Sequence, residues 1–271
     1  MGIKNLSKIL KKYSPEVYRE KSLQEYAGKK IGIDISLYMY KYKCIFGEAW
    51  LNAFVNLICC LRKFNIHLVF IFDSKAPIEK KEEQEERRRN RQKLVEKLES
   101  IEKDYEEYKE SGEISELLYG LCISKDMPQR LLTKDVKVFR EDTVISKINT
   151  LKNQTISIDK EDFKLARKLF RRMKVPYVDA TSEAEATGAY LTKIGKLYGI
   201  MTADTDVLAY GATKFINSVN TNNNTCIEID MQELLEKLEM TQDQFRDMCI
   251  MCGTDYNKNI PRIGPMKSYD L

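Results

Sequence analysis

Two pairs of acidic residues with the same spacing lie close together in the second half of the sequence. Glu183 and Glu185 belong to TSEAEATGAY, and Asp204 and Asp206 belong to MTADTD. Taken alone, the first pair has an ordinary explanation, because Ser182 followed three residues later by Glu185 is the pattern of a capping box at a helix start. Carboxylates so close together can also bind divalent cations, and the rest of the sequence has to decide between the two interpretations.

The elements around these acids predict a sheet of parallel strands. Segments 29–36 and 66–73 are short and rich in β-branched residues, and the apolar residues of 48–64 between them recur at helical spacing. A second series follows, with expected helices at 161–175 and 182–196 and expected strands at 175–180 and 197–204. This alternation predicts an α/β fold with a central, mostly parallel sheet flanked by helices.

On this scaffold the acids fall at one edge. Asp34, Asp73 and Asp204 each end an expected strand, and the two glutamates open the helix that follows segment 175–180. Parallel strands bring these positions to the carboxyl edge of the sheet, where ligands bind. Adding Asp206, two residues after Asp204, and Asp255 from CGTDYNKN gives an expected cluster of seven acids: Asp34, Asp73, Glu183, Glu185, Asp204, Asp206 and Asp255.

Seven neighbouring carboxylates would repel one another and raise each other's pKa values unless cations neutralised them. Oxygen ligands without histidine or thiolate favour hard ions such as Mg²⁺ or Mn²⁺. Two such ions about 4 Å apart are a standard device for cleaving phosphodiester bonds. The chain has a single histidine, His67, at the start of an expected strand, which argues against histidine-based acid–base chemistry.

Composition sets the wider limits. The 271 residues are 43% hydrophobic and carry a formal net charge of +4, which suits a globular protein and permits a nucleic-acid partner. No apolar run approaches the roughly 20 residues that span a bilayer, so no membrane association is expected. The seven scattered cysteines fit a reducing, intracellular compartment. Cys249 and Cys252 are expected to be buried helix thiols and not half of a zinc site.

A long insertion, 78–158, separates the two halves of the expected core. It opens with a highly charged segment, 79–110, in which opposite charges often lie four residues apart, and this pattern predicts a solvated helical protrusion. We therefore expect four parts: residues 1–77 and 159–240 as the two halves of the core, 78–158 as the insertion, and 241–271 as a C-terminal segment.

Six motifs, in this order, resemble those of the flap endonuclease (XPG-type) family of 5′ nucleases: MGIKNL, IGIDISLYMY, VFIFDSKAP, YVDATSEAEA, TADTDVLAYGA and MCGTDYNKNIPRIGP. The resemblance implies a PIN-like nuclease core, a helical arch formed by the insertion, and a C-terminal helix-hairpin-helix-type DNA-binding motif. It also implies that all seven acids named above bind two Mg²⁺ ions, with Mn²⁺ as a substitute.

Other positions match family residues one by one. By this resemblance Lys80 and Arg87 lie at the base of the arch and help to position the scissile phosphate, and Tyr40 stacks on a nucleotide. Gly2 becomes the N-terminal residue near the active site once Met1 is removed. In NIPRIGP, Gly264 and the nearby Lys267 contact DNA, and the motif can hold a monovalent cation such as K⁺.

The sequence departs from the family pattern in two places. The stretch between Asp73 and Glu183 is longer than is typical, which predicts an enlarged arch and leaves the preference for threaded flaps open. The sequence ends at Leu271, so the resemblance gives no sliding-clamp-binding tail, and a monomer is expected.

The expected function is metal-dependent, structure-specific cleavage at 5′ flaps, nicks, junctions or 5′ ends of DNA in replication, repair or recombination. A 5′→3′ exonuclease of the same superfamily, acting on DNA or RNA, is the nearest alternative. A catalytically silent junction binder is disfavoured because all seven acids are present. A phosphatase for small molecules would need neither the insertion nor the hairpin. Residence in the nucleus or the cytoplasm and a viral origin all stay open.

Overall fold

The computed structural model describes residues 2–74, 77–122, 139–257 and 259–270. Its internal contacts divide the chain into two compact units. The core unit consists of Met1–Glu83 together with Ile158–Leu271, and the helical unit consists of Gln84–Ser157. Each is described by itself below.

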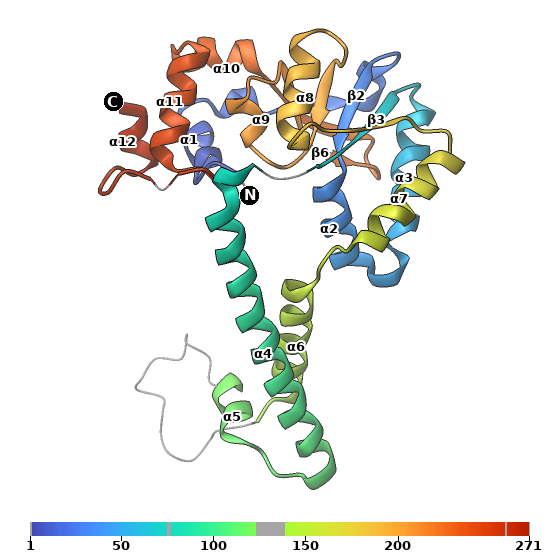
Figure 1. The fold of residues 1–271 in the computed structure, drawn as a ribbon, viewed down its shortest axis with the longest axis vertical. Coiled ribbons are helices and arrows are strands. Elements are labelled where there is room, and N and C mark those ends of the chain that lie inside the picture. Colours follow the sequence, from blue (N-terminus) through green and yellow to red (C-terminus); the bar gives the residue numbers. More distant parts are fainter. Residues whose placement is uncertain (1, 75–76, 123–138, 258, 271) are drawn as a thin grey trace. The chain divides into compact units, whose positions relative to one another are not determined.

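A mostly parallel sheet forms the centre of the core unit (Figure 1). Its order in the described part of the chain is β1-β7-β6-β5-β2-β3-β4. The parallel strands are β2 (Lys30–Asp34), β3 (His67–Phe72), β4 (Tyr177–Asp179), β5 (Gly199–Met201) and β6 (Lys214–Asn220). The antiparallel edge consists of β7 (Thr225–Asp230) and β1 (Arg19–Ser22). The predicted mostly parallel sheet is therefore confirmed, and the antiparallel edge is an addition to it.

Strand register brings the ends of the parallel strands together. Asp34 is paired with Ile71, and Phe72 is paired with Asp179, so β2, β3 and β4 run level to the same edge. Strand β5 pairs with the other side of β2 and ends nearby at Met201. This carboxyl edge carries the candidate site.

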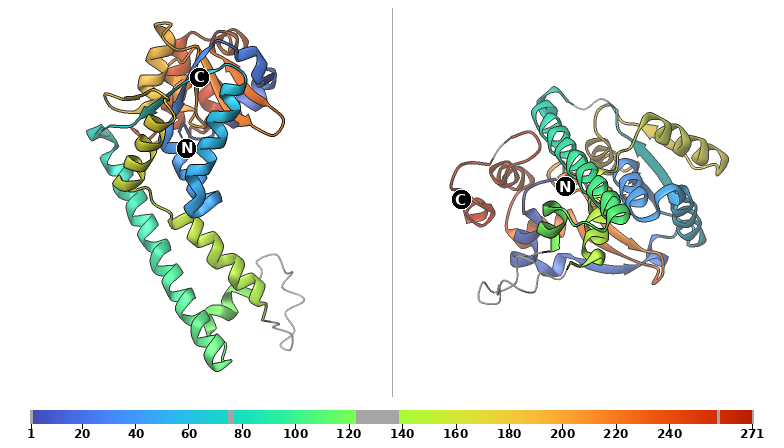
Figure 2. Two further views of the ribbon diagram at one scale, coloured as in Figure 1. Left: turned by 90° about the vertical axis from the view of Figure 1, so that its right-hand side faces the viewer. Right: turned by 90° about the horizontal axis from the view of Figure 1, so that it is seen from below.

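Helices cover both faces of the sheet and bury its central strands β2, β3 and β5 between them. On one face lie α2 (Ile35–Phe46), α3 (Trp50–Lys63) and α7 (Lys160–Arg172), and on the other α1 (Leu6–Tyr13), α8 (Ala184–Lys193), α9 (Asp206–Ala209), α10 (Met231–Leu238) and α11 (Gln242–Cys252) (Figures 1 and 2). Alternation along β3 sends Phe70 to the first face, where it stacks on Phe170 with ring centroids 3.9 Å apart. Ile71 points to the second face.

Short elements complete the core unit. Single 3-10 turns cover Pro15–Val17, Leu23–Tyr26, Gly47–Ala49 and Ile78–Lys80. Near the C-terminus, α12 (Pro265–Asp270) packs against α1, and Tyr13 stacks on Tyr269 with centroids 4.0 Å apart. As predicted, Cys249 and Cys252 are buried on α11.

One apolar segment is longer than the sequence analysis allowed. By length and composition alone, Ile35–Lys63 could cross a membrane. The structure breaks this segment into α2, the Gly47–Ala49 turn and α3, and its buried residues include Met39, Phe54 and Leu61. These side chains belong to the core of one sheet face, so packing explains part of the segment's apolar character, although only 33% of its apolar window is buried.

The described residues of the helical unit form three helices. These are most of α4 (Lys81–Ser111), α5 (Glu116–Cys122) and α6 (Glu141–Thr155). The apolar positions of α4 are sparse, but they are sufficient for a small core. Its buried members are Leu98, Ile101, Leu118, Val144, Ile148 and Leu151. An ion pair of 2.7 Å between Lys152 and Glu102 lies beside this core.

Candidate metal and nucleic-acid site

Asp34 is the most deeply buried acid of the site. It ends β2 and is the N-cap of α2, where it accepts a hydrogen bond of 3.0 Å from the backbone N–H of Ser36. Its other oxygen accepts a 3.0 Å bond from the hydroxyl of Thr202, and the residue is only 2% exposed. The cap and the hydroxyl together fix the carboxylate at the carboxyl edge of the sheet.

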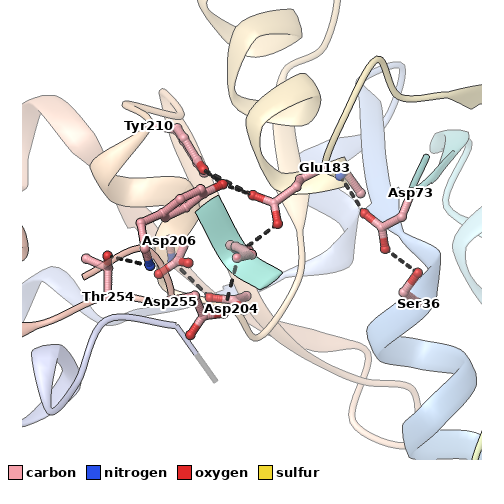
Figure 3. A network of polar contacts seen from close by, with 11 residues as sticks. Ser36, Asp73, Glu183, Asp204, Asp206, Tyr210, Thr254 and Asp255 are labelled. Carbon is pink, nitrogen blue, oxygen red and sulfur yellow. Dashed lines mark hydrogen bonds and ion pairs between the residues drawn. The ribbon is translucent and has the colours of Figure 1, made fainter. Parts of the chain in front are cut away.

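Asp73 follows β3 and reaches across to the next helix. Its carboxylate accepts a 2.7 Å hydrogen bond from the backbone N–H of Ala184, the first residue of α8, and a second bond from the hydroxyl of Ser36 (Figure 3). The capping box predicted for Ser182 and Glu185 is therefore wrong. The N-cap of α8 is Glu183, whose side chain makes no capping bond, because an acid from the neighbouring strand satisfies the helix start instead.

Asp204 and Asp206 lie in a tight turn after β5. The N–H of Asp204 donates to the hydroxyl of Thr202 over 3.1 Å, and the N–H of Asp206 donates to Oδ1 of Asp204 over 3.0 Å. Both carboxylates are buried. Among the described residues, Oδ1 of Asp206 is buried without a hydrogen-bond partner. Such an orphaned acceptor in a polar site is typical of a missing ion or water.

A lysine lies between the remaining acids. The ammonium of Lys80 is 2.6 Å from Oε1 of Glu183 and 3.4 Å from Oδ2 of Asp255, and 4.7 Å from the ring centroid of Tyr256. The other oxygen of Glu183 contacts the hydroxyls of Tyr210 and Tyr256 (Figure 3). The strand ends and the start of α8, which the sequence predicted, thus carry five of the acids, and the start of α9 carries Asp206. The loop after α11 brings Asp255 to the same edge.

Burial and mutual repulsion raise the pKa values of several of these acids. Burial, followed by the charge of Asp73, raises the pKa of Asp34 to about 7. Burial, followed by the charge of Asp34, raises the pKa of Glu185 to about 9. Burial and then Asp204 raise the pKa of Asp206 to about 7, and burial also raises the pKa of Asp204. The protein alone therefore does not neutralise the charge that it has gathered.

These residues fit a hard divalent cation by their chemistry. All the candidate ligands are carboxylate oxygens, and Oδ1 of Asp206 has no partner within the described ranges. The raised pKa values of Asp34, Glu185 and Asp206 also call for positive charge. As they stand, no three Asp, Glu, Cys or His side chains of those ranges are grouped tightly enough to hold an ion. Lys80 instead lies between two of the acids.

Gly2 approaches the acids more closely than any side chain could allow. Its φ is +89°, and a Cβ added to it would lie 2.1 Å from Oδ1 of Asp204 and 2.8 Å from Oδ1 of Asp206. Only glycine permits this contact, because it has no Cβ and tolerates positive φ. The N-terminal segment is thus part of the site's wall.

The other predicted residues lie on separate elements. Tyr40 is on α2, 38% exposed, and Arg87 is on α4 in the helical unit, also exposed. Gly264 precedes α12, where a Cβ would meet no atom within 4 Å, and Lys267 is exposed on that helix.

The sequence analysis missed the polar residues that hold the acids in place. They are Ser36, Thr202, Tyr210 and Tyr256. A partial signal exists in the sequence. Tyr256 is adjacent to Asp255, and Tyr210 follows Asp206 by four residues, about one helical turn. Each tyrosine therefore lies on the same short segment as one of the acids.

An acid-rich carboxyl edge on a mostly parallel sheet defines a class of metal-site α/β proteins, and comparisons with known proteins narrow that class. The XPG N-terminal domain matches residues 1–94, and the XPG I-region matches residues 174–255. The chain is 34% identical to the probable RAD2-like endonuclease 369L of Invertebrate iridescent virus 6. It is 38% identical to the probable RAD2-like endonuclease 076L of Invertebrate iridescent virus 3. These alignments cover 100% and 99% of this chain and 71% and 78% of the relatives.

Matches of lower sequence identity point to the same family. Flap endonuclease 1 of Glycine max is 30% identical over 100% of this chain and 65% of its own length. Among solved structures, the catalytic core of Rad2 in complex with DNA substrate matches with a TM-score of 0.67 at 20% identity, over 99% of this chain and 67% of that one. The chain therefore belongs to the XPG-type family of structure-specific 5′ nucleases.

Proposed function

We propose that this chain is a Mg²⁺-dependent nuclease that cleaves DNA at 5′ flaps or 5′ ends. The observation that carries the proposal is the gathering of seven carboxylates at one sheet edge, two of which contact the buried ammonium of Lys80. The curated relatives named flap endonuclease 1 support the flap as substrate, and the Rad2 complex supports DNA as the partner. Because a single chain contributes all seven acids, we take the active form to be a monomer.

The acids fall into two groups, which suits a pair of ions. Glu185 interacts electrostatically with Asp34, Asp73 and Asp204, whereas Asp206 interacts with Asp204, Asp255 and Glu183. Asp204 is thus shared by the two groups. Glu183 and Glu185 therefore serve different groups although one residue separates them. We assign one Mg²⁺ to each group, with Mn²⁺ as a substitute. When bound, two such ions supply an activated water and stabilise the leaving oxygen.

The chain's own residues bind and orient the substrate around these ions. The ammonium of Lys80, already beside Glu183 and Asp255, is placed to bind a non-bridging oxygen of the scissile phosphate. A cation there stabilises charge that develops in the transition state. We assign the same task to Arg87, whose guanidinium can contact phosphate with two N–H groups.

Three further residues bind DNA away from the cut. We propose that the exposed ring of Tyr40 stacks on a base, which is a contact that tolerates any sequence. Gly264, with open space where a Cβ would be, lets a phosphate approach the start of α12, and Lys267 adds charge there. A K⁺ ion held by main-chain carbonyls of this loop completes the proposed hairpin. A DNA substrate implies action inside the cell, in the nucleus or the cytoplasm.

The test uses 5′-labelled single-flap, double-flap, nicked, blunt and single-stranded DNA, each with Mg²⁺ or with EDTA. Metal-dependent release of the flap as one oligonucleotide is the expected result. Stepwise release of short products from nicks or ends would assign a 5′→3′ exonuclease instead. Absence of cleavage with tight, salt-sensitive binding would leave only a junction binder.

Paired variants control this test. Asp204→Ala should abolish cleavage but retain most DNA binding, because the carboxylate serves the reaction and does not contact the duplex. Asp243→Ala, on α11, removes an acid whose side chain is 84% exposed and should cleave like the parent. Full activity of Asp204→Ala would remove the basis of the metal-site assignment.

A further inference from the structure

One oxygen of Glu183 is held by two tyrosines. The hydroxyl of Tyr256 donates to Oε2 of Glu183, the hydroxyl of Tyr210 lies 3.2 Å from the same oxygen, and the two hydroxyls are 2.8 Å apart. Figure 3 shows Tyr210 on the side of Glu183 that faces away from Asp73. Oε1 of the same carboxylate is 2.6 Å from the ammonium of Lys80. The carboxylate therefore has a tyrosine side and a cation side.

The two tyrosines come from elements that carry other acids. Tyr210 is the C-cap of α9, the short helix that begins at Asp206, and Tyr256 directly follows Asp255. Glu183 is the N-cap of α8. The hydroxyl contacts thus tie together three acid-bearing segments that no hydrogen bond between the acids themselves could join, because ionised carboxylates only accept.

The hydroxyl protons cannot serve all three contacts at once. Each phenol has one proton, so the pair has two donors for the contacts Tyr256–Glu183, Tyr210–Glu183 and Tyr210–Tyr256. If Tyr256 donates to Glu183, Tyr210 can donate to Tyr256. If the hydroxyl of Tyr256 is removed, the hydroxyl of Tyr210 can donate directly to Glu183. Either tyrosine alone can therefore keep one hydrogen bond on Oε2.

We infer that Tyr210 and Tyr256 are positioning residues which hold Oε2 of Glu183 and so aim Oε1 at the cation that the site binds. This inference rests on the proposed assignment of Glu183 as a metal ligand. Lys80, 2.6 Å from Oε1, marks the direction from which positive charge approaches. Groups that hydrogen-bond a ligating carboxylate set its orientation, and their loss typically lowers metal affinity about 10–100-fold.

The shared hydrogen bonds give the inference a distinctive signature. Tyr210→Phe and Tyr256→Phe should each lower the affinity for Mn²⁺ by no more than about threefold, since the remaining hydroxyl still binds Glu183. The double variant should lower it about tenfold or more. Phenylalanine keeps both rings, and with them the contact of Lys80 with ring 256, so that only the hydroxyls are tested.

The affinity of the DNA-free protein for Mn²⁺ is measured by electron paramagnetic resonance, which detects the free ion. Single-turnover cleavage and urea unfolding are measured on the same variants. Tyr190→Phe is the matched control, because Tyr190 lies on α8 and is 60% exposed. Glu183→Gln is the reference variant. It tests the metal ligand itself, independently of the tyrosines.

Three results would support or overturn the inference. A loss of Mn²⁺ affinity in the double variant that exceeds the product of the single losses, with unchanged urea stability, supports the shared hydrogen bonds. If the double variant binds Mn²⁺ like the parent while Glu183→Gln does not, the positioning role is wrong and the metal ligand stands. If Glu183→Gln also binds like the parent, the proposed metal assignment itself fails, and this inference fails with it.

Discussion

The ammonium of Lys80 lies between two carboxylates, 2.6 Å from Oε1 of Glu183 and 3.4 Å from Oδ2 of Asp255. Burial by itself lowers the pKa of Lys80, but the hydrogen bond and charge of Glu183 outweigh burial and raise that pKa above its ordinary value. The lysine therefore stays charged and lies beside carboxylates whose charge a metal ion would also neutralise. If Glu183 and Asp255 bind metal as proposed, a divalent cation and this ammonium compete for the same oxygens.

Replacing Lys80 by Met should separate cation binding from cleavage. In the DNA-free protein, Mn²⁺ affinity should rise, because the competing ammonium is gone and its methylene packing is kept. Cleavage of the preferred substrate should fall about 100-fold or more, since a cation that stabilises transition-state charge is lost. Lys81→Met, one residue along at the exposed start of α4, is the control. Weaker Mn²⁺ binding in Lys80→Met would contradict the competition.

Gly2→Ala should damage the site through a single methyl group. The new Cβ would lie 2.1 Å from Oδ1 of Asp204, and the φ of +89° is unfavourable for alanine, so the N-terminal segment has to shift. We expect cleavage to fall about tenfold or more, because a displacement of about 1 Å at a catalytic site can cost 100-fold. Gly120→Ala, on α5 with no atom within 4 Å of the new Cβ, should cleave normally. Equal rates for the two variants would show that the N-terminal segment does not constrain Asp204.

The gathering of Asp34, Asp73 and Asp204 at one edge could be predicted because each follows a strand of a parallel sheet. The spacing of apolar residues and the β-branched composition identify such strands, and parallel pairing brings their carboxyl ends to the same edge of the sheet. The antiparallel β6–β7 pair was not predicted, although its Asn-rich connection, 221–224, is a recognisable turn signal between two strand-like segments. Asp255 reaches the site through a loop, and the order of strands gives no reason for its position there.

Contacts that cross the chain could not be read from local patterns. Ser182 and Glu185 have the spacing of a capping box, yet the N–H of Ala184 is satisfied by Asp73, which is 111 residues away in sequence. A tertiary partner thus replaced a local one. The contact of Tyr210 with Glu183 likewise depends on how α8 and α9 pack, and no spacing rule gives the direction of a side chain at a helix end.

The acid cluster predicts how stability depends on pH when metal is absent. The pKa values of Asp34 and Asp206 are raised to about 7 and that of Glu185 to about 9, all above their ordinary values near 4. The folded state therefore binds more protons than the unfolded state between about pH 4 and pH 9, so unfolding free energy falls as pH rises through this window. A loss of even about 2 kcal/mol would lower Tm by roughly 5 °C.

Thermal unfolding in EDTA at pH 5, 7 and 9 measures this effect. Addition of Mg²⁺ should remove most of the decline, because the ions neutralise the carboxylates. Asp206→Asn should raise Tm at pH 9 in EDTA and change it little at pH 5, since it removes a buried charge only where that charge is present. A Tm in EDTA that stays level or rises from pH 5 to pH 9 would argue against a clustered set of raised pKa values.

Arg87 offers a test of whether the helical unit takes part in chemistry or only in docking. Arg87 and Arg89 both lie on the exposed first half of α4, and Arg89 is 3.9 Å from Glu85 on the same helix. If Arg87 contacts the scissile phosphate as proposed, Arg87→Ala should lower the single-turnover cleavage rate about 100-fold. The dissociation constant for DNA should rise much less, by no more than about fivefold, because many phosphates share the binding energy.

Arg89→Ala is the matched variant, with the same charge removed two residues along the helix. It should change both quantities by similar small factors, as expected for a cation that only adds to long-range attraction. Both variants are measured under single turnover with saturating protein, and binding is measured with Ca²⁺ in place of Mg²⁺ to prevent cleavage. If Arg87→Ala loses rate and affinity equally, Arg87 is a docking residue and its proposed contact with the scissile phosphate is wrong.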